Sequence, residues 1–152
     1  MKYFIACCSI ILTSISSCKE NNKKGDLILE ESEIAERANN YYQHDQYLKA
    51  KLSFDTLILI TPLKSDYYFR RGYSKSMLLN DDKGTIEDYL KAIHYGYKNS
   101  KSAYLNIGTI YRSNENYDSA IFYYDKSLEL DSNFDKALKE KDEVLKLLER
   151  TK

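Results

Sequence analysis

The apolar and polar positions between Tyr117 and Leu130 alternate with the period of a helix. The sequence there is YDSAIFYYDKSLEL. Its apolar residues follow one another at intervals of three or four and share one helical face: Tyr117, Ala120, Ile121, Tyr124 and Leu128. Most of the charged residues fall elsewhere, where water can solvate them. We therefore expect a helix whose aromatic residues belong to a core, rather than to a binding stripe or a cofactor site.

The segment before this helix has the same period. Tyr104, Ile107, Gly108 and Tyr111 share a face, and Gly108 leaves room for a neighbouring helix to approach. The polar sequence SNEN, residues 113–116, separates the two segments. The pattern predicts a helical hairpin.

The hairpin pattern recurs along the chain. Equivalent positions are 34 to 36 residues apart in three sets: Ile34, Tyr68 and Tyr104; Ala38, Gly72 and Gly108; Phe54, Tyr89 and Tyr124. The extra residues that change the spacing fall in a turn, 80–84, and in a link, 96–100. A repeat of this length in a helix–turn–helix pattern predicts a solenoid.

The repeated residues resemble the tetratricopeptide repeat family, whose pattern has an aromatic residue, Leu, a small residue and Tyr, then Ala, an aromatic residue, Ala and Pro. The third repeat matches best, with Tyr104, Ile107, Gly108, Tyr111, Ala120 and Tyr124. The second repeat departs from the pattern, because Arg71, Lys75 and Thr85 stand where Leu, Tyr and Ala are expected. The resemblance implies an all-α fold, a right-handed α-solenoid of three hairpins at 31–64, 65–100 and 101–134.

Residues 135–152 are predicted to form a C-terminal capping helix and a short tail. Leu138, Val144, Leu145 and Leu148 give one apolar stripe, and Lys and Glu residues cover the rest. Three repeats and a cap are about the smallest array that buries a continuous core.

The first 18 residues have the pattern of a signal peptide. The apolar run Tyr3–Leu12 is too short to span a bilayer as a helix. The residues that end at Cys18, Ile-Ser-Ser-Cys, resemble the lipobox of bacterial lipoproteins, which implies lipidation of Cys18 and attachment to a membrane. An ordinary secretory signal and an uncleaved anchor are the alternatives. Residues 19–30 are expected to be a polar tether, and Lys19 favours the outer membrane of the bacterial envelope over the inner one.

Charge and composition argue against several other classes of function. Lys and Arg number 23, as do Asp and Glu, so the net charge of zero gives no field that would attract nucleic acid. Neither His44 nor His94 has a second ligand at metal-binding spacing. We find no phosphate-binding loop and no nucleophile with a matching base. The sequence therefore predicts no catalytic residue, cofactor or small-molecule substrate.

One pattern imitates a calcium-binding loop. Asp131, Asn133, Asp135 and Asp142 match four ligand positions, but Lys136 stands where the loop requires Gly. We interpret this segment as a polar link between two helices and predict no metal site.

The resemblance implies that the first helix of each hairpin lines a concave groove that binds another protein or a peptide. The groove positions carry Asn39, Tyr42, Phe69, Arg70, Tyr73, Leu105, Asn106, Thr109 and Arg112, with Ala35, Met77, Lys139 and Glu143 beside them. Tyr, Phe and Arg often dominate binding energy. A subgroup of the family clamps a terminal carboxylate, but only Asn39 matches that clamp. Its other positions hold Ala35, Arg70, Ser102 and Asn106.

The sequence as a whole predicts a non-enzymatic adaptor or scaffold, attached by lipid to the bacterial envelope, that binds a partner protein in the groove. The alternative is a structural subunit of an envelope complex, or a self-associating module, that uses its convex face. Tyr97 and Tyr123 are the expected exposed residues of that face. An enzyme is the third class, and no catalytic constellation supports it.

Overall fold

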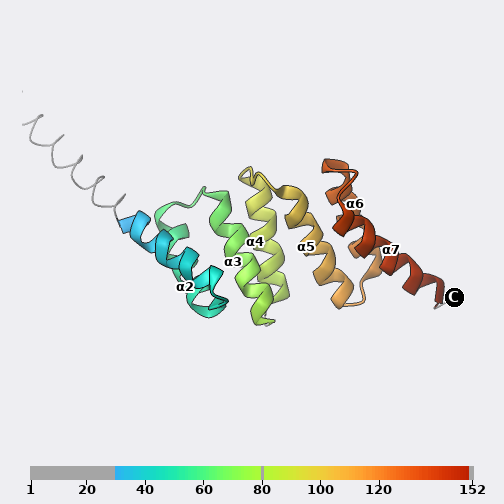
Figure 1. The fold of residues 1–152 in the computed structure, drawn as a ribbon, viewed down its shortest axis with the longest axis horizontal. Coiled ribbons are helices and arrows are strands. Elements are labelled where there is room, and N and C mark those ends of the chain that lie inside the picture. Colours follow the sequence, from blue (N-terminus) through green and yellow to red (C-terminus); the bar gives the residue numbers. More distant parts are fainter. Residues whose placement is uncertain (1–29, 80, 151–152) are drawn as a thin grey trace, which may run out of the picture.

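The computed structural model describes residues 30–79 and 81–150, which form seven helices joined by short turns (Figure 1). The first helix covers residues 30–43. It is followed by α2 (Tyr47–Ile60), α3 (Ser65–Leu78), α4 (Asp82–His94), α5 (Ser100–Ser113), α6 (Tyr117–Leu130) and α7 (Asp135–Arg150). The predicted all-helical stack of three hairpins and a capping helix is confirmed.

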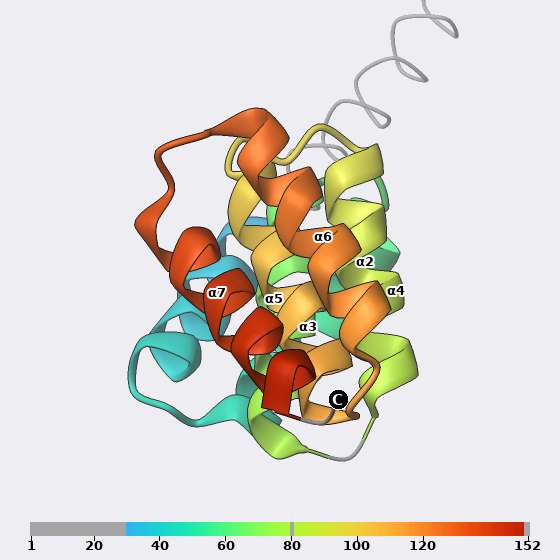
Figure 2. The ribbon, with the colours of Figure 1, turned by 90° about the vertical axis from the view of Figure 1, so that its right-hand side faces the viewer.

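The hairpins stack along the long axis of the molecule (Figure 1). Helix 30–43 pairs with α2, α3 with α4, and α5 with α6. Successive hairpins meet where α2 packs on α3 and α4 packs on α5. Figure 2, which looks along the stack from its C-terminal end, shows α7 lying across α5 and α6.

Polar residues in the turns define where helices begin and end. The Asp81 carboxylate accepts a hydrogen bond from the Gly84 amide at 2.8 Å, and the Asn116 side chain accepts one from the Ser119 amide at 3.2 Å. Each bond satisfies a backbone donor that the first turn of a helix leaves free. The turn within each hairpin also contains one residue with a positive φ, in the left-handed backbone conformation. These residues are Asp45, Leu79 and Glu115, one in each hairpin. These turns reverse the chain within a few residues.

The core lies between the helices at the repeated apolar positions. Buried residues include Ala38, Phe54, Leu57, Tyr89, Ile107, Ala120, Tyr124 and Val144. Gly108 is where α5 and α6 approach most closely, because a Cβ atom there would lie 2.5 Å from Cε1 of Tyr124. The expected role of Gly108 is therefore confirmed.

The capping helix differs from its prediction. Ala137 and Val144 are buried and Leu148 packs beside them, but Leu138 and Leu145 are 46% and 42% exposed. The prediction of one buried stripe is wrong for these two leucines. In an inner repeat, the first helix packs on the preceding hairpin and on its own second helix. Among the described residues, α7 packs on the preceding hairpin but has no second helix of its own. The side of α7 that would face such a helix therefore stays in water.

The two tyrosines expected on the convex face are also placed differently. The ring of Tyr97 stacks on Phe69 with centroids 4.3 Å apart, and that of Tyr123 stacks on Tyr111 at 5.4 Å. Both rings are half-buried, and burial raises the pKa of both phenols. The exposed ring of α6 belongs to Phe122, which is 54% exposed.

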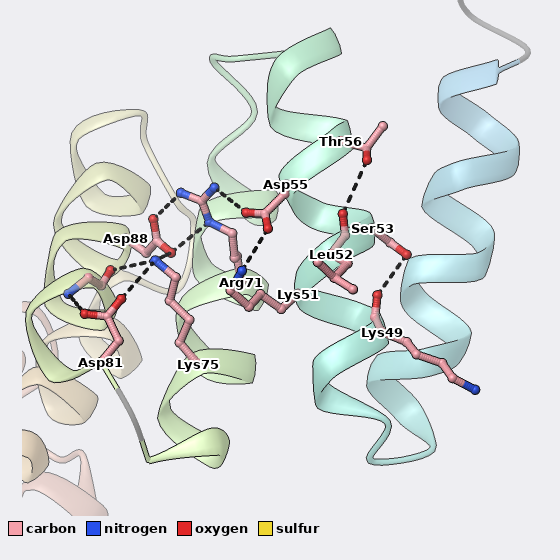
Figure 3. Close-up of polar contacts among 11 residues, drawn as sticks. Lys49, Lys51, Leu52, Ser53, Asp55, Thr56, Arg71, Lys75, Asp81 and Asp88 are labelled. Carbon is pink, nitrogen blue, oxygen red and sulfur yellow. Dashed lines mark hydrogen bonds and ion pairs between the residues drawn. The ribbon is translucent and has the colours of Figure 1, made fainter.

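Two polar departures of the second repeat, Arg71 and Lys75, belong to one cluster of charges inside its hairpin (Figure 3). Asp88, only 2% exposed, accepts hydrogen bonds from Arg71 at 2.8 Å and pairs with Lys75 at 3.0 Å. Arg71 also pairs with Asp55 of α2 at 2.9 Å. Carboxylates therefore face both buried cations, which is the condition under which charges are tolerated in an interior.

Candidate binding surface on the first helices

The structure brings together the predicted groove residues of the first two repeats. Asn39 and Tyr42 lie on helix 30–43, and Phe69, Arg70 and Tyr73 lie on α3. The rings of Tyr42 and Tyr73 are 5.4 Å apart, and the Arg70 guanidinium lies 5.4 Å from the Tyr42 ring. The two helices thus share one aromatic surface.

Two further aromatic rings extend this surface. Tyr47, the first residue of α2, lies 6.0 Å from the Tyr73 ring, and Tyr97, in the link after α4, stacks on Phe69. We call the five residues Tyr42, Tyr47, Phe69, Tyr73 and Tyr97 the aromatic strip. All five side chains are half-buried, so each keeps part of its surface in contact with solvent. Aromatic residues of this kind often anchor partners in interfaces.

The tyrosine hydroxyls of the strip are held in their neutral form. Burial raises the pKa of Tyr42 to about 12. The hydrogen bond that Tyr47 donates to Asp45 raises the pKa of Tyr47 to about 12. Burial also raises the pKa of Tyr97. At neutral pH, these three groups are therefore uncharged, and Tyr47 already uses its hydroxyl proton in the bond to Asp45.

Carboxylates of the same chain pair with both predicted groove cations. Arg70 donates to Asp66 at 2.7 Å. Arg112 pairs with Glu143 at 2.8 Å and with Glu140 at 3.0 Å, both on α7. The positive charges on this surface are thus balanced locally.

The predicted residues of the third repeat mostly hold the fold together. Leu105 is only 9% exposed and belongs to the core that includes Val144. Asn106 donates to the Tyr89 hydroxyl at 3.2 Å, and the Thr109 hydroxyl donates to the Leu105 carbonyl at 3.1 Å. Leu105 is therefore part of the core, whereas Asn106, Thr109 and Arg112 are half-buried, as the residues of the strip are.

Asn39 also lies near the strip, but its acceptor is not accessible. Its Oδ1 atom is buried and has no hydrogen-bond partner among the described residues. A buried acceptor without a partner is costly, and in this conformation a ligand cannot reach it. Asn39 lies three residues before Tyr42, on the same side of helix 30–43.

The expected lipidation site, Cys18, and most of the tether lie outside the described residues. Within residues 30–79 and 81–150, the helices are too short or too polar to cross a membrane. The same part of the chain holds no cluster of three or more His, Cys, Asp or Glu residues that could bind a metal ion.

Comparisons with known proteins agree with the fold. Residues 102–134 match the family model described as Tetratricopeptide repeat. A search of curated proteins finds no match. Among solved structures, the Arabidopsis OM64 TPR domain is 23% identical with a TM-score of 0.69, and the alignment covers 76% of this chain and 94% of that one.

Two similar structures contain bound peptides. The first TPR of Spaghetti (RPAP3), bound to the HSP90 peptide SRMEEVD, is 19% identical with a TM-score of 0.69, covering 78% of this chain and 92% of that one. The second TPR domain of human RPAP3, in complex with the HSP70 peptide SGPTIEEVD, is 14% identical with a TM-score of 0.68, covering 78% and 97%. Residues 30–79 and 81–150 therefore have the fold of a tetratricopeptide repeat domain.

Proposed function

We propose that this protein is a non-enzymatic adaptor that binds a peptide segment of a partner protein on the surface formed by its first helices. The observation that carries the proposal is the aromatic strip, whose five rings are all partly exposed. Two proteins of the same fold were solved with peptides bound. Partly exposed aromatic rings are groups that can hold an extended chain.

The partner of this chain should differ from the peptides of those two proteins. Both of those peptides contain the acidic sequence EEVD. The clamp positions other than Asn39 carry Ala35, Arg70, Ser102 and Asn106 in this chain. Arg70 is the one cation among these four residues, and it already pairs with Asp66. An acidic tail would therefore meet no unmatched positive charge at these positions.

Attachment to the bacterial envelope is the second part of the proposal. It is supported by the apolar leader and by the lipobox-like residues that end at Cys18. Two lipid chains would make a stable anchor, because each buried methylene contributes about 0.8 kcal/mol. The tether of residues 19–30 would keep the repeats near the membrane surface, where we expect the partner to be found.

A pull-down from native membranes tests the binding surface. The lipidated protein is compared with a Tyr42→Ala/Tyr73→Ala variant, and Phe122→Ala on α6 serves as a matched control, because it removes another partly exposed ring. We expect a partner that the wild type and the control both retain and that the strip variant loses. Equal capture by all three proteins would contradict the proposal and would favour the alternative in which the convex face or α7 forms the interface.

Membrane extraction of a Cys18→Ser variant tests the anchor separately. We expect the wild type to remain with membranes after a high-salt wash and the variant to be released or to keep its leader uncleaved. Wild-type protein without lipid on Cys18, as measured by mass spectrometry, would refute the anchor and leave the binding surface untouched.

A further inference from the structure

We propose that the aromatic strip binds an uncharged, proline-rich segment in the polyproline II conformation. This inference rests on the proposed function, because it specifies which kind of peptide the same surface binds. Three properties of the strip carry it: the inclination of its rings, its neutral hydrogen-bonding groups and the balance of its charges.

The rings of the strip form ridges rather than a flat sheet. Tyr73 is inclined by 59° to Tyr42 and by 62° to Tyr47, with centroids 5.4 and 6.0 Å apart. Phe69, one helical turn before Tyr73, is nearly parallel to Tyr97, at 18°. Partly exposed aromatic rings offer apolar contacts to compact pyrrolidine rings. Proline-rich chains bind to aromatic-lined surfaces in this way, because the polyproline II conformation is already ordered before binding.

The polar groups of the strip match the needs of such a chain. A polyproline II segment makes no internal hydrogen bonds, so its carbonyl groups need outside donors. The hydroxyls of Tyr42 and Tyr73 can act as donors.

The charges near the strip favour an uncharged occupant. Arg70 is the cation beside Tyr42, and its bond to Asp66 is 2.7 Å long. A negatively charged peptide would have to compete with Asp66 for Arg70, and a positively charged one would have to compete with Arg70 for Asp66. A neutral peptide leaves the pair intact and therefore avoids this loss.

Calorimetric titration of the full chain in detergent micelles tests the inference. The probe is an acetylated and amidated peptide of Pro-Pro-Ala repeats, about nine residues and so about 28 Å long at 3.1 Å per residue. Two peptides of the same length serve as comparisons, one with Gly and one with Glu in place of Pro. We expect the Pro peptide to bind about tenfold more tightly than either. Equal or tighter binding of the Gly or Glu peptide, or no measurable binding of the Pro peptide, would overturn the inference.

Three variants tie the binding to the strip. Tyr73→Ala should weaken the Pro peptide about tenfold, as loss of an anchoring ring does. Tyr73→Phe, which keeps the ring, should lose less, and Phe122→Ala should bind as the wild type does. Circular dichroism confirms that each variant is folded. Unchanged affinity of a folded Tyr73→Ala protein would also overturn the inference.

The same titrations separate this inference from the proposed function. If the Glu peptide binds best and depends on Tyr73, the surface is a peptide site and only the proline-rich partner is wrong. If capture from membranes does not depend on the strip, the proposed function itself fails.

Discussion

The second and third hairpins have the same backbone arrangement but fill equivalent positions with opposite chemistry. Arg71, Lys75 and Asp88 of the second repeat correspond to Ile107, Tyr111 and Tyr123 of the third, which are 36, 36 and 35 residues further along. In the second hairpin, Asp88 joins the two cations in a buried cluster. In the third, Tyr111 and Tyr123 stack with their rings 6° from parallel and Ile107 is fully buried.

The difference shows that the side chains at these positions must fit one another, either as an ion cluster or as an apolar stack, and that no particular residue is required. An aromatic stack that loses one ring leaves an apolar surface behind. An ion cluster that loses one member leaves an unpaired charge in the interior, which costs much more. The two hairpins should therefore respond differently to single substitutions, although their folds are alike.

The largest effect is expected for Asp88→Ala. The change leaves Arg71 with Asp55 as its remaining carboxylate and leaves Lys75 with Asp81, 3.8 Å away. We therefore expect the free energy of unfolding to fall by about 3 kcal/mol, the lower end of the range for a broken buried pair. Urea unfolding followed by circular dichroism measures it. Glu87→Ala, at an exposed neighbouring position, is the control and should change stability by less than about 0.5 kcal/mol. Equal effects of the two changes would show that the cluster does not stabilise the hairpin.

Moving the third repeat's residues into the second should reverse that loss. The triple variant Arg71→Ile, Lys75→Tyr, Asp88→Tyr replaces the whole cluster at once, and Asp55 keeps its pair with Lys51 at 2.9 Å. Replacing a complete buried ion cluster by apolar residues is usually neutral or stabilising, by about 1–4 kcal/mol. Urea unfolding measures the change. A triple variant as unstable as Asp88→Ala would mean that the hairpins are not interchangeable.

The two interior glycines offer a smaller, matched comparison. Gly108→Ala places a Cβ atom 2.5 Å from the Tyr124 ring and 3.2 Å from the Ala120 carbonyl oxygen, so we expect a loss of about 1–3 kcal/mol. At Gly72 the nearest atom is Cβ of Asp88, at 3.2 Å. Gly72→Ala should be nearly neutral, because the better helix propensity of Ala, worth about 1 kcal/mol, offsets the tighter contact. Thermal unfolding compares them, and equal losses would contradict the closer packing of the third hairpin.

The smallest effect is expected for an ion pair at the edge of the stack. The pKa of Glu31 is lowered, first by the hydrogen bond from Tyr67 and then by Lys64. Its contribution, below about 1 kcal/mol, should be present above the ordinary pKa of Glu and lost as the pH falls through the lowered value. Wild type and Glu31→Gln should therefore differ in stability at pH 7 and converge in acid. A difference that grows in acid would contradict this assignment.

The sequence predicts the fold well because the fold depends on spacing. The apolar period of three and four, the interval near 34 and the small residue at Gly108 are all local or repeating signals. The ion cluster is harder to predict, because Arg71 and Lys75 each look like a departure when compared with the family pattern one position at a time, and Asp88 is not part of that pattern. Their match becomes visible only when α3 and α4 lie side by side. Leu138 and Leu145 were misplaced for a related reason, since their pattern fits a helix with two neighbours.

The binding surface is only partly predictable. The first-helix positions include Tyr42 and Tyr73, whose rings lie 5.4 Å apart. They omit Tyr47 and Tyr97, which lie at a helix start and in a link and reach the surface from there. The pair of Arg70 with Asp66 has i,i+4 spacing on one helix and could have been read from the sequence. Spacing cannot reveal that Arg112 pairs with Glu140 and Glu143, because these belong to another helix.

Site-specific photo-crosslinking in living cells tests most directly whether a partner lies on the surface of the first helices. A photoreactive amino acid replaces Met77, which is 47% exposed on α3, or Phe122, which is 54% exposed on α6. We predict a discrete adduct from position 77, lost when Tyr42 and Tyr73 are also changed to Ala, and none from position 122. Adducts from position 122 alone, or adducts from position 77 that persist without the two tyrosines, would contradict the account.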